Sequence, residues 1–136
     1  MRGYQLVSTP AVDYQAEDAV ISQGVVESNH TGYTGTGFVN YDNLVGSYVE
    51  WTVPAAAAGN ATLDLRYANG TTVNRPMDIA VNGTVVAANR SFNPTGAWTT
   101  WATSSMTVPL AAGANTIRAT ATTANGGPNV DKISIS

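Results

Sequence analysis

The sequence predicts an all-β domain, either a sandwich or a barrel, from three observations. Apolar and polar residues alternate in short runs that recur about every ten residues along the chain. Glycine, asparagine and proline bound these runs, as they do where strands turn. No long stretch combines a helical spacing of apolar residues with capping residues at both ends. With 136 residues, the chain has the usual length of one domain with one core.

Three runs, at 48–53, 62–67 and 77–81, show the alternation of a half-buried strand most clearly. The residues on their apolar faces are Val49, Trp51 and Val53, then Leu63, Leu65 and Tyr67, then Met77, Ile79 and Val81. We expect these side chains to face the core.

Turn signals place the reversals between strands. Asn82 and Gly83 stand between the third run and a fourth at 84–87, and an Asn-Gly pair supplies the two positive φ values of a type I′ hairpin turn. A second reversal is predicted at 111–114, where Gly113 precedes a strand at 116–122. A last strand is predicted at 130–136. The alanine-rich stretch 55–58 is too short to nucleate a helix and is predicted to be a loop.

The whole chain, 1–136, is expected to be a single module, because it contains neither an internal repeat nor a low-complexity linker. Residues 1–11 are expected to be a linker or the remnant of an excised fragment. The start of the chain lacks the charged and apolar regions of a signal peptide. No window approaches the ~20 apolar residues that span a membrane.

Charge is sparse and scattered. Charged residues make up 11% of the chain, and the net charge is −3. The basic residues stand singly at Arg2, Arg66, Arg75, Arg90, Arg118 and Lys132. Nucleic acids and anionic membranes are bound through clustered positive charge, so the sequence argues against both as partners. The expected partner is neutral, or is an anion bound through a metal ion.

Few residues in this sequence suggest catalysis. The nine carboxylates could supply a glycosidase pair. The one histidine, His30, has no motif that pairs it with a serine or cysteine nucleophile, and we expect it to be a surface loop residue. The absence of cysteine excludes disulfides and thiolate metal sites. The sequence therefore favours a binding domain over an enzyme.

Oxygen-bearing side chains near both ends of the chain could hold a calcium ion. Gln15 and Glu17 are two residues apart and so lie on one face of an extended strand. Asp131 is in phase with the apolar residues of the last strand, and a carboxylate that faces the core needs a partner. Calcium accepts ligands of this kind and would clip the first strand to the last. A salt bridge from Asp131 to Lys132 or to an arginine is the alternative.

Two aromatic residues stand in predicted loops. Tyr33 lies in a glycine-rich segment, and Trp98 follows a group of turn residues. Exposed rings offer flat apolar surfaces on which the C–H faces of sugars can stack. The alternative is that either ring folds down to plug the loop core. Trp51 is in phase with core residues and Trp101 is expected inside a strand, so both are assigned to the core.

Short motifs cover about residues 12–136 in a fixed order. They are 14–19 (YQAEDA), 32–39 (GYTGTGFV), 67–70 (YANG), 74–77 (NRPM), 81–83 (VNG), 95–101 (TGAWTTW), Leu110 with 113–117 (GANTI), and 129–133 (NVDKI). The same order is seen in carbohydrate-binding modules of families 6 and 35, and the sequence resembles family 35 most. The resemblance implies a β-sandwich of the jelly-roll type. It also implies a structural calcium held by Gln15, Glu17 and Asp131, with a backbone carbonyl that we assign to Thr36.

The resemblance further implies a sugar site in the loops at one end of the sandwich. The candidate sugar-binding residues are Tyr33, Arg75, Trp98, Asn129 and Asn43. Some family 35 members bind a uronic acid carboxylate through a second calcium, and Asp42 and Asn43 are the candidate ligands for it here. Arg75 is the candidate contact for a hydroxyl or carboxylate group.

Sequence and resemblance together predict a non-catalytic, calcium-dependent module that recognises a terminal uronic acid, either glucuronic or unsaturated galacturonic acid. A net-negative protein with one arginine near the site would need a bound cation to hold a carboxylate. The alternatives are a module for galactose or mannan, a small polysaccharide lyase or glycosidase, and a structural adhesion domain. The expected setting is a secreted, extracellular, monomeric module covalently linked to the catalytic domain of a polysaccharide-degrading enzyme.

Overall fold

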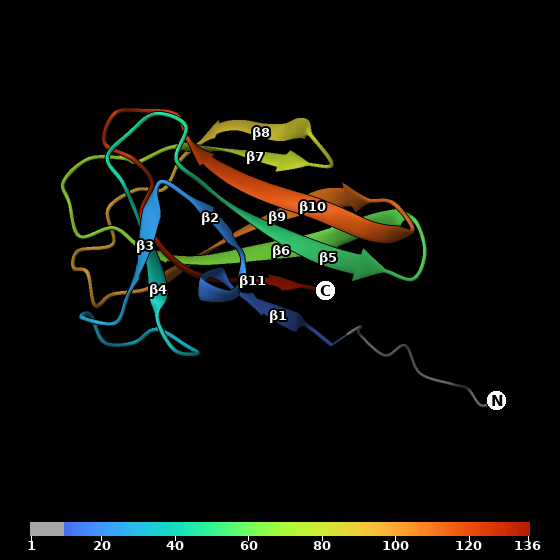
Figure 1. The fold of residues 1–136 in the computed structure, drawn as a ribbon, viewed down its shortest axis with the longest axis horizontal. Helices are drawn as coiled ribbons and strands as arrows, with labels where there is room; N and C mark the ends of the chain where they lie inside the picture. The colour runs from blue at the N-terminus through green and yellow to red at the C-terminus, as the bar shows by residue number, and fades with distance from the viewer. Residues whose placement is uncertain (1–9) are drawn as a thin grey trace.

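The computed structural model describes residues 10–136, which form two antiparallel β-sheets packed face to face (Figure 1). The strands are β1 (Val12–Gln15), β2 (Val20–Ser22), β3 (Gly24–Glu27), β4 (Phe38–Tyr41), β5 (Tyr48–Ala55), β6 (Gly59–Ala68), β7 (Met77–Val81), β8 (Thr84–Arg90), β9 (Ala102–Leu110), β10 (Gly113–Ala121) and β11 (Asn129–Ile135). One short 3₁₀ helix, η1 (Ala16–Asp18), follows β1. Most of the expected linker at 1–11 lies outside the described residues, and Pro10 and Ala11 precede the first strand.

The strand order confirms the predicted all-β, jelly-roll sandwich. One sheet has the order β3-β4-β11-β6-β9, with β1 also paired to β11, and the other has the order β2-β5-β10-β7-β8. Between β4 and β7, and again between β8 and β11, each successive strand lies in the opposite sheet. Sequence neighbours therefore face each other across the core.

The predicted runs become strands at nearly the predicted positions. The run 77–81 is β7, while 48–53 and 62–67 lie inside the longer β5 and β6. Asn82 and Gly83 have φ values of 51° and 83°, so the hairpin turn between β7 and β8 has the predicted pair of positive φ angles. Gly113, with φ 95°, lies within the second predicted reversal and is already the first residue of β10, which therefore begins earlier than the predicted 116.

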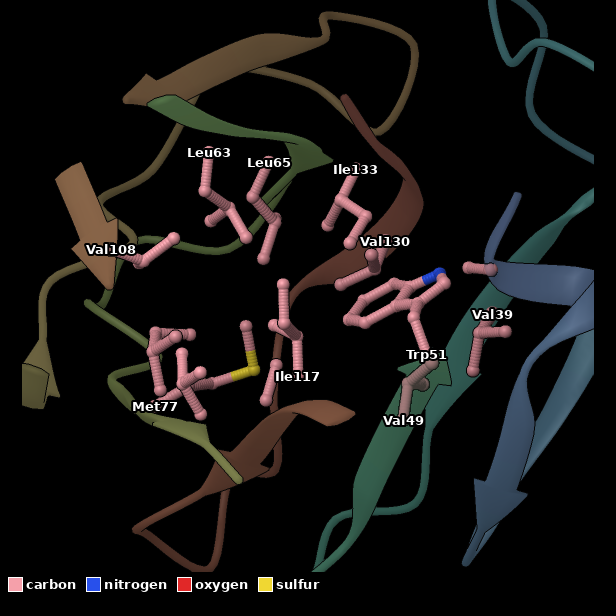
Figure 2. Close-up of a cluster of buried hydrophobic side chains, with 14 of the residues drawn as sticks. Val39, Val49, Trp51, Leu63, Leu65, Met77, Val108, Ile117, Val130 and Ile133 are labelled. Atoms are coloured by element: carbon pink, nitrogen blue, oxygen red, sulfur yellow. The ribbon is translucent and has the colours of Figure 1, made fainter. Parts of the chain in front are cut away.

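The core lies between the sheets and is built from the alternating faces of these strands. Trp51 is 2% exposed and packs with Val49 and Val130 in the cluster shown in Figure 2. The assignment of Trp51 to the core is therefore confirmed. Trp101 is different, because it precedes β9 instead of lying inside a strand and is only half-buried. Its indole N–H donates to the Thr31 carbonyl at 2.9 Å, so Trp101 closes a loop at the edge of the core.

The first and last strands lie side by side, as the proposed clip requires. β1 pairs antiparallel with β11, and Gln15 lies opposite Lys132. Lys132 Nζ donates to Asp13 at 2.8 Å, and this hydrogen bond lowers the pKa of the Asp13 carboxyl group. Because Lys132 is engaged with Asp13 on the neighbouring strand, it is not the partner of Asp131.

The loops after β3, β4, β6, β8 and β10 gather at one end of the sandwich, at the left in Figure 1. The tight turns between β5 and β6, β7 and β8, and β9 and β10 lie at the other end. Connecting loops carry most binding residues in rigid β-domains. No helix in the described part of the chain is long and apolar enough to cross a membrane.

Candidate functional site

A pocket of about 330 Å³ lies among the gathered loops. Its lining residues come from several separate segments of the chain and carry amide, charged and aromatic groups. They are Glu27, Asn29, His30, Asn40, Asn43, Arg75, Trp98 and Asn129. Several convergent polar groups beside one aromatic surface are typical of a small-ligand site.

Trp98 forms the aromatic wall of this pocket. It is half-buried in the loop between β8 and β9, where it stacks with His30 at 6.0 Å between ring centroids and 24° between planes. The Arg75 guanidinium lies 5.6 Å from the centroid of the indole ring. These two contacts hold the indole ring of Trp98 at the pocket.

Arg75 and Glu27 bring opposite charges to the pocket. Arg75 Nη1 donates to the Gly127 carbonyl at 3.3 Å, while Nε is buried and has no hydrogen-bond partner among the described residues. Burial lowers the pKa of the Arg75 guanidinium, because it removes water from the charged form. The Glu27 carboxylate accepts a hydrogen bond of 2.9 Å from Asn40 Nδ2. The pocket can therefore meet both donor and acceptor groups of a ligand.

The structure brings four predicted sugar-binding residues together and leaves one outside. Arg75, Trp98, Asn129 and Asn43 all line the pocket, and Asn129 is 4% exposed. Tyr33 does not line it; its half-buried ring packs instead against Phe38, with 5.9 Å between centroids. This contact matches the alternative in which the ring of Tyr33 plugs the loop core.

Asp42 also lies apart from the pocket lining. Its side chain is exposed, and its backbone carbonyl accepts hydrogen bonds from Leu44 N at 2.8 Å and Ser47 Oγ at 3.1 Å. Of the predicted pair for a second calcium, only Asn43 reaches the pocket. The carboxylate that lines the pocket is that of Glu27.

Sequence patterns did not single out Glu27, Asn29, His30 and Asn40 as pocket residues. His30, expected on the surface of a loop, is half-buried between the pocket and Phe38. Glu27 and Asn40 come from the paired strands β3 and β4. Recognising from the sequence that these two strands pair would have placed both side chains together. The strands are too short to show clear periodicity, so the sequence did not predict them.

The predicted ligands of the structural calcium ion, Gln15, Glu17 and Asp131, converge on the glycine-rich loop. Gln15 exchanges hydrogen bonds with Thr34 Oγ1 at 3.1 and 3.2 Å, and Glu17 Oε2 accepts from Thr36 N at 2.9 Å. Asp131 is fully buried and accepts from both the backbone N–H and the hydroxyl of Thr34, each at 2.9 Å. Side chains from near the start of the chain, Gln15 and Glu17, therefore meet Asp131 from the last strand around 34–36. Thr36 takes part through its N–H, whereas the resemblance assigned its carbonyl.

An arginine also contacts this group. Arg66 Nη1 donates to Asp131 Oδ2 at 2.9 Å, so the arginine of the salt-bridge alternative is Arg66. Glu17 Oε1, however, is buried without a hydrogen-bond partner in the described residues. A buried carboxylate oxygen without a donor suits a cation.

The chemistry of the donor set limits how a metal could bind. Within residues 10–136, no three His, Cys, Asp or Glu side chains cluster closely enough to hold a metal ion on their own. A cation at this place would need the amide oxygen of Gln15 and backbone oxygens beside the two carboxylates. Calcium accepts such a mixed oxygen set, so the residues fit it.

Other hollows of similar size lack this combination of groups. One of about 410 Å³ lies between Pro10 and the Ala55–Ala58 loop and is lined mostly by apolar residues. Another of about 410 Å³ lies on the outer face of β5, β7 and β10, beside Asp78 and Arg118. Neither gathers a tryptophan and several amides, so the loop pocket is the stronger candidate.

Comparison with known families places the chain among carbohydrate-binding modules. Residues 15–136 match the model of carbohydrate binding module family 6. A family 35 module from Clostridium thermocellum superposes with a TM-score of 0.91 at 50% identity, covering 93% of this chain and 98% of the other. A second solved family 35 module, described as bound to a disaccharide that contains glucuronic acid, superposes with a TM-score of 0.83 at 41% identity and 92% coverage of both chains.

Two enzymes contain a segment similar to this chain. An exo-beta-D-glucosaminidase from Amycolatopsis orientalis is 63% identical over 124 residues, 91% of this chain. An endo-1,4-beta-xylanase B from Cellvibrio japonicus is 43% identical over 116 residues, 82% of this chain. The chain spans only 12% and 19% of the lengths of these two enzymes.

Proposed function

We propose a function from one premise: the chain belongs to carbohydrate-binding module family 35, which is related to family 6. The module binds a sugar in the loop pocket and performs no chemistry on it. The observation that carries the proposal is the convergence of Trp98, Arg75 and Asn129 in one pocket. The indole offers a stacking surface, while the amide and guanidinium groups can read the hydroxyl and carboxylate groups of a sugar.

The sugar class that these groups suit best is a terminal uronic acid. Arg75 lines the pocket and is partly desolvated, so a ligand carboxylate could accept charge-assisted hydrogen bonds from its guanidinium group. A solved family 35 module at 41% identity is described in complex with a disaccharide containing glucuronic acid. Both observations support glucuronic or a related uronic acid over the neutral sugars galactose and mannose.

Glu27 would repel a ligand carboxylate unless a cation lies between them. Glu27, Asn43 and Asn129 line the pocket, and their side chains carry oxygen atoms of the type that calcium accepts. We therefore propose these three residues, in place of Asp42, as the ligands of a calcium ion at the sugar site. Such an ion would supply the positive charge that holds a uronic acid carboxylate.

An amino sugar is the second candidate, and Glu27 is the observation that favours it. A carboxylate in the pocket could accept hydrogen bonds from a protonated amine without any metal ion. The relative that is 63% identical is named an exo-beta-D-glucosaminidase, although its name describes the whole enzyme. Binding of glucosamine in the presence of a chelator would favour this candidate over the uronic acid.

Replacing Arg75 with glutamine should reduce the preference for the charged sugar. With calcium present in both proteins, we expect the ratio of glucuronic acid affinity to glucose affinity to be at least about tenfold lower in Arg75→Gln than in the parent, a difference of about 1.4 kcal/mol. Titration calorimetry with both sugars measures this. The matched control is Arg118→Gln, because Arg118 also stacks on an aromatic ring, at 3.8 Å from Tyr48, but lies on the β10 face. An unchanged preference in Arg75→Gln would contradict the assignment.

A separate proposal concerns a structural calcium ion beside the glycine-rich loop, away from the sugar site. We propose that Gln15, Glu17 and Asp131 hold a structural calcium ion with backbone oxygens of the loop. Support comes from the convergence of the three side chains and from the buried, unpartnered Glu17 Oε1. The ion would tie η1 and β1 to β11.

The relatives support a proposal about where this module works. Enzymes that act on polysaccharides contain segments 63% and 43% identical to this chain. We propose that this module is secreted, is covalently linked to a catalytic domain of such an enzyme, and holds the enzyme near its substrate. Binding at one site raises the effective concentration of the linked domain at the polysaccharide.

A further inference from the structure

The backbone of Gly70 lies directly against the indole ring of Trp98. A Cβ atom at this position would lie 2.5 Å from Cδ1, 2.6 Å from Cγ and 2.7 Å from Cδ2 of the indole. Gly70 does not have a left-handed φ, so its φ does not by itself require glycine. Close approach to Trp98, and not backbone freedom, is what requires glycine here.

A buried asparagine holds the loop that carries Gly70 against the loop that carries Trp98. Asn69 is 0% exposed, and its Nδ2 donates to the carbonyls of Val73 and Phe92, each at 2.9 Å. Its backbone N–H donates to Thr95 Oγ1 at 3.0 Å, and its carbonyl accepts from Thr95 N at 2.8 Å. The bonds to Phe92 and Thr95 join the loop that carries Gly70 to the loop that carries Trp98. A side chain at position 70 would therefore displace the indole instead of separating the loops.

The position of the indole also determines what it can contact. Trp98 stacks with His30 on one neighbouring loop and lies near the Arg75 guanidinium on another. A shift away from Gly70 would disturb both contacts and change the depth of the pocket. We infer that Gly70 is a positioning residue, which sets the depth of Trp98 in the sugar pocket and thereby the affinity for the ligand. The effect on affinity rests on the proposed function, whereas the effect on the indole does not.

Gly70→Ala tests this inference, with Gly59→Ala as the matched control. A Cβ atom at Gly59 would meet nothing within 4 Å, and Gly59 also lacks a left-handed φ. We expect Gly70→Ala to weaken glucuronic acid binding at least about tenfold, and Gly59→Ala to bind like the parent. The indole N–H signal of Trp98 in a ¹⁵N spectrum, assigned with Trp98→Phe, should shift in Gly70→Ala without any sugar.

A double variant keeps the test decisive if Gly70→Ala also lowers stability. In a Trp98→Ala background the added methyl group meets no indole, so Gly70→Ala should no longer change the melting temperature. An unshifted indole signal, or a loss of stability that persists without Trp98, would overturn the positioning role. If the indole signal shifts in Gly70→Ala but the parent protein itself binds no uronic acid, the result would support the positioning role and count against the proposed function.

Discussion

Trp51→Ala is expected to destabilise the domain by about 3–5 kcal/mol, because the removed side chain leaves a cavity in the core. Trp51 is 2% exposed and packs among buried residues of both sheets (Figure 2). Denaturant unfolding measures the loss. Sugar affinity, determined well below the melting temperature, should stay close to that of the parent, because Trp51 lies outside the pocket lining.

Trp98→Ala should give the opposite pattern. Removing the aromatic wall of a small site costs ~2 kcal/mol or more of binding free energy, roughly thirtyfold in affinity. Because Trp98 is half-buried in a loop, we expect little change in the free energy of unfolding. A Trp98→Ala protein that unfolds as easily as Trp51→Ala, or that binds sugar normally, would place the site elsewhere.

Asp131→Ala should lower the free energy of unfolding by about 3 kcal/mol, because it leaves Arg66 and Thr34 without their partner. Asp131 is fully buried and bonds to both residues at 2.9 Å. Asp13→Asn is the control, because it breaks the ion pair with Lys132 next to the same strand. Asp13 is 46% exposed in that pair, so we expect a loss below about 1 kcal/mol.

The response to calcium distinguishes the two roles considered for Asp131, which are calcium ligand and salt-bridge partner of Arg66. A ligand that binds only the folded state adds stability as its concentration exceeds its Kd. We therefore expect a chelator to lower the melting temperature of the parent and of Asp13→Asn, but not that of Asp131→Ala. If the parent and Asp131→Ala responded equally to calcium and chelator, the calcium clip would be wrong and the salt bridge to Arg66 would account for the burial of Asp131.

The sequence predicted those parts of the fold that local patterns encode. Alternation located β5, β6 and β7 and assigned Trp51 to the core, and the Asn82-Gly83 pair located the hairpin. Trp101 was placed wrongly inside a strand. It stands just before β9 and bonds to the Thr31 carbonyl across a loop, and a long-range contact of this kind has no periodic signal.

The site was only partly predictable for the same reason. The alternation of the last strand showed that Asp131 faces inward and needs a partner. It could not show that the partner is Arg66, which lies on β6 beside a register shift between Val130 and Lys132 in the β6–β11 pairing. Glu27 comes to the pocket from the short strand β3 and His30 from the loop after it, and neither segment has a periodic pattern that could have predicted this. The contact between Gly70 and Trp98 joins two loops, and a glycine in a turn-rich segment does not reveal it.

A titration of the ¹⁵N-labelled domain with glucuronic acid, in the presence of calcium, tests whether the loop pocket is the sugar site. It reports both whether the sugar binds and where it binds. We predict saturable shifts of the Trp98 indole signal together with the side-chain signals of Arg75 and Asn129, all with one Kd. Shifts that gather instead on the β10 face around Asp78 and Arg118, or no shifts at millimolar sugar, would contradict it.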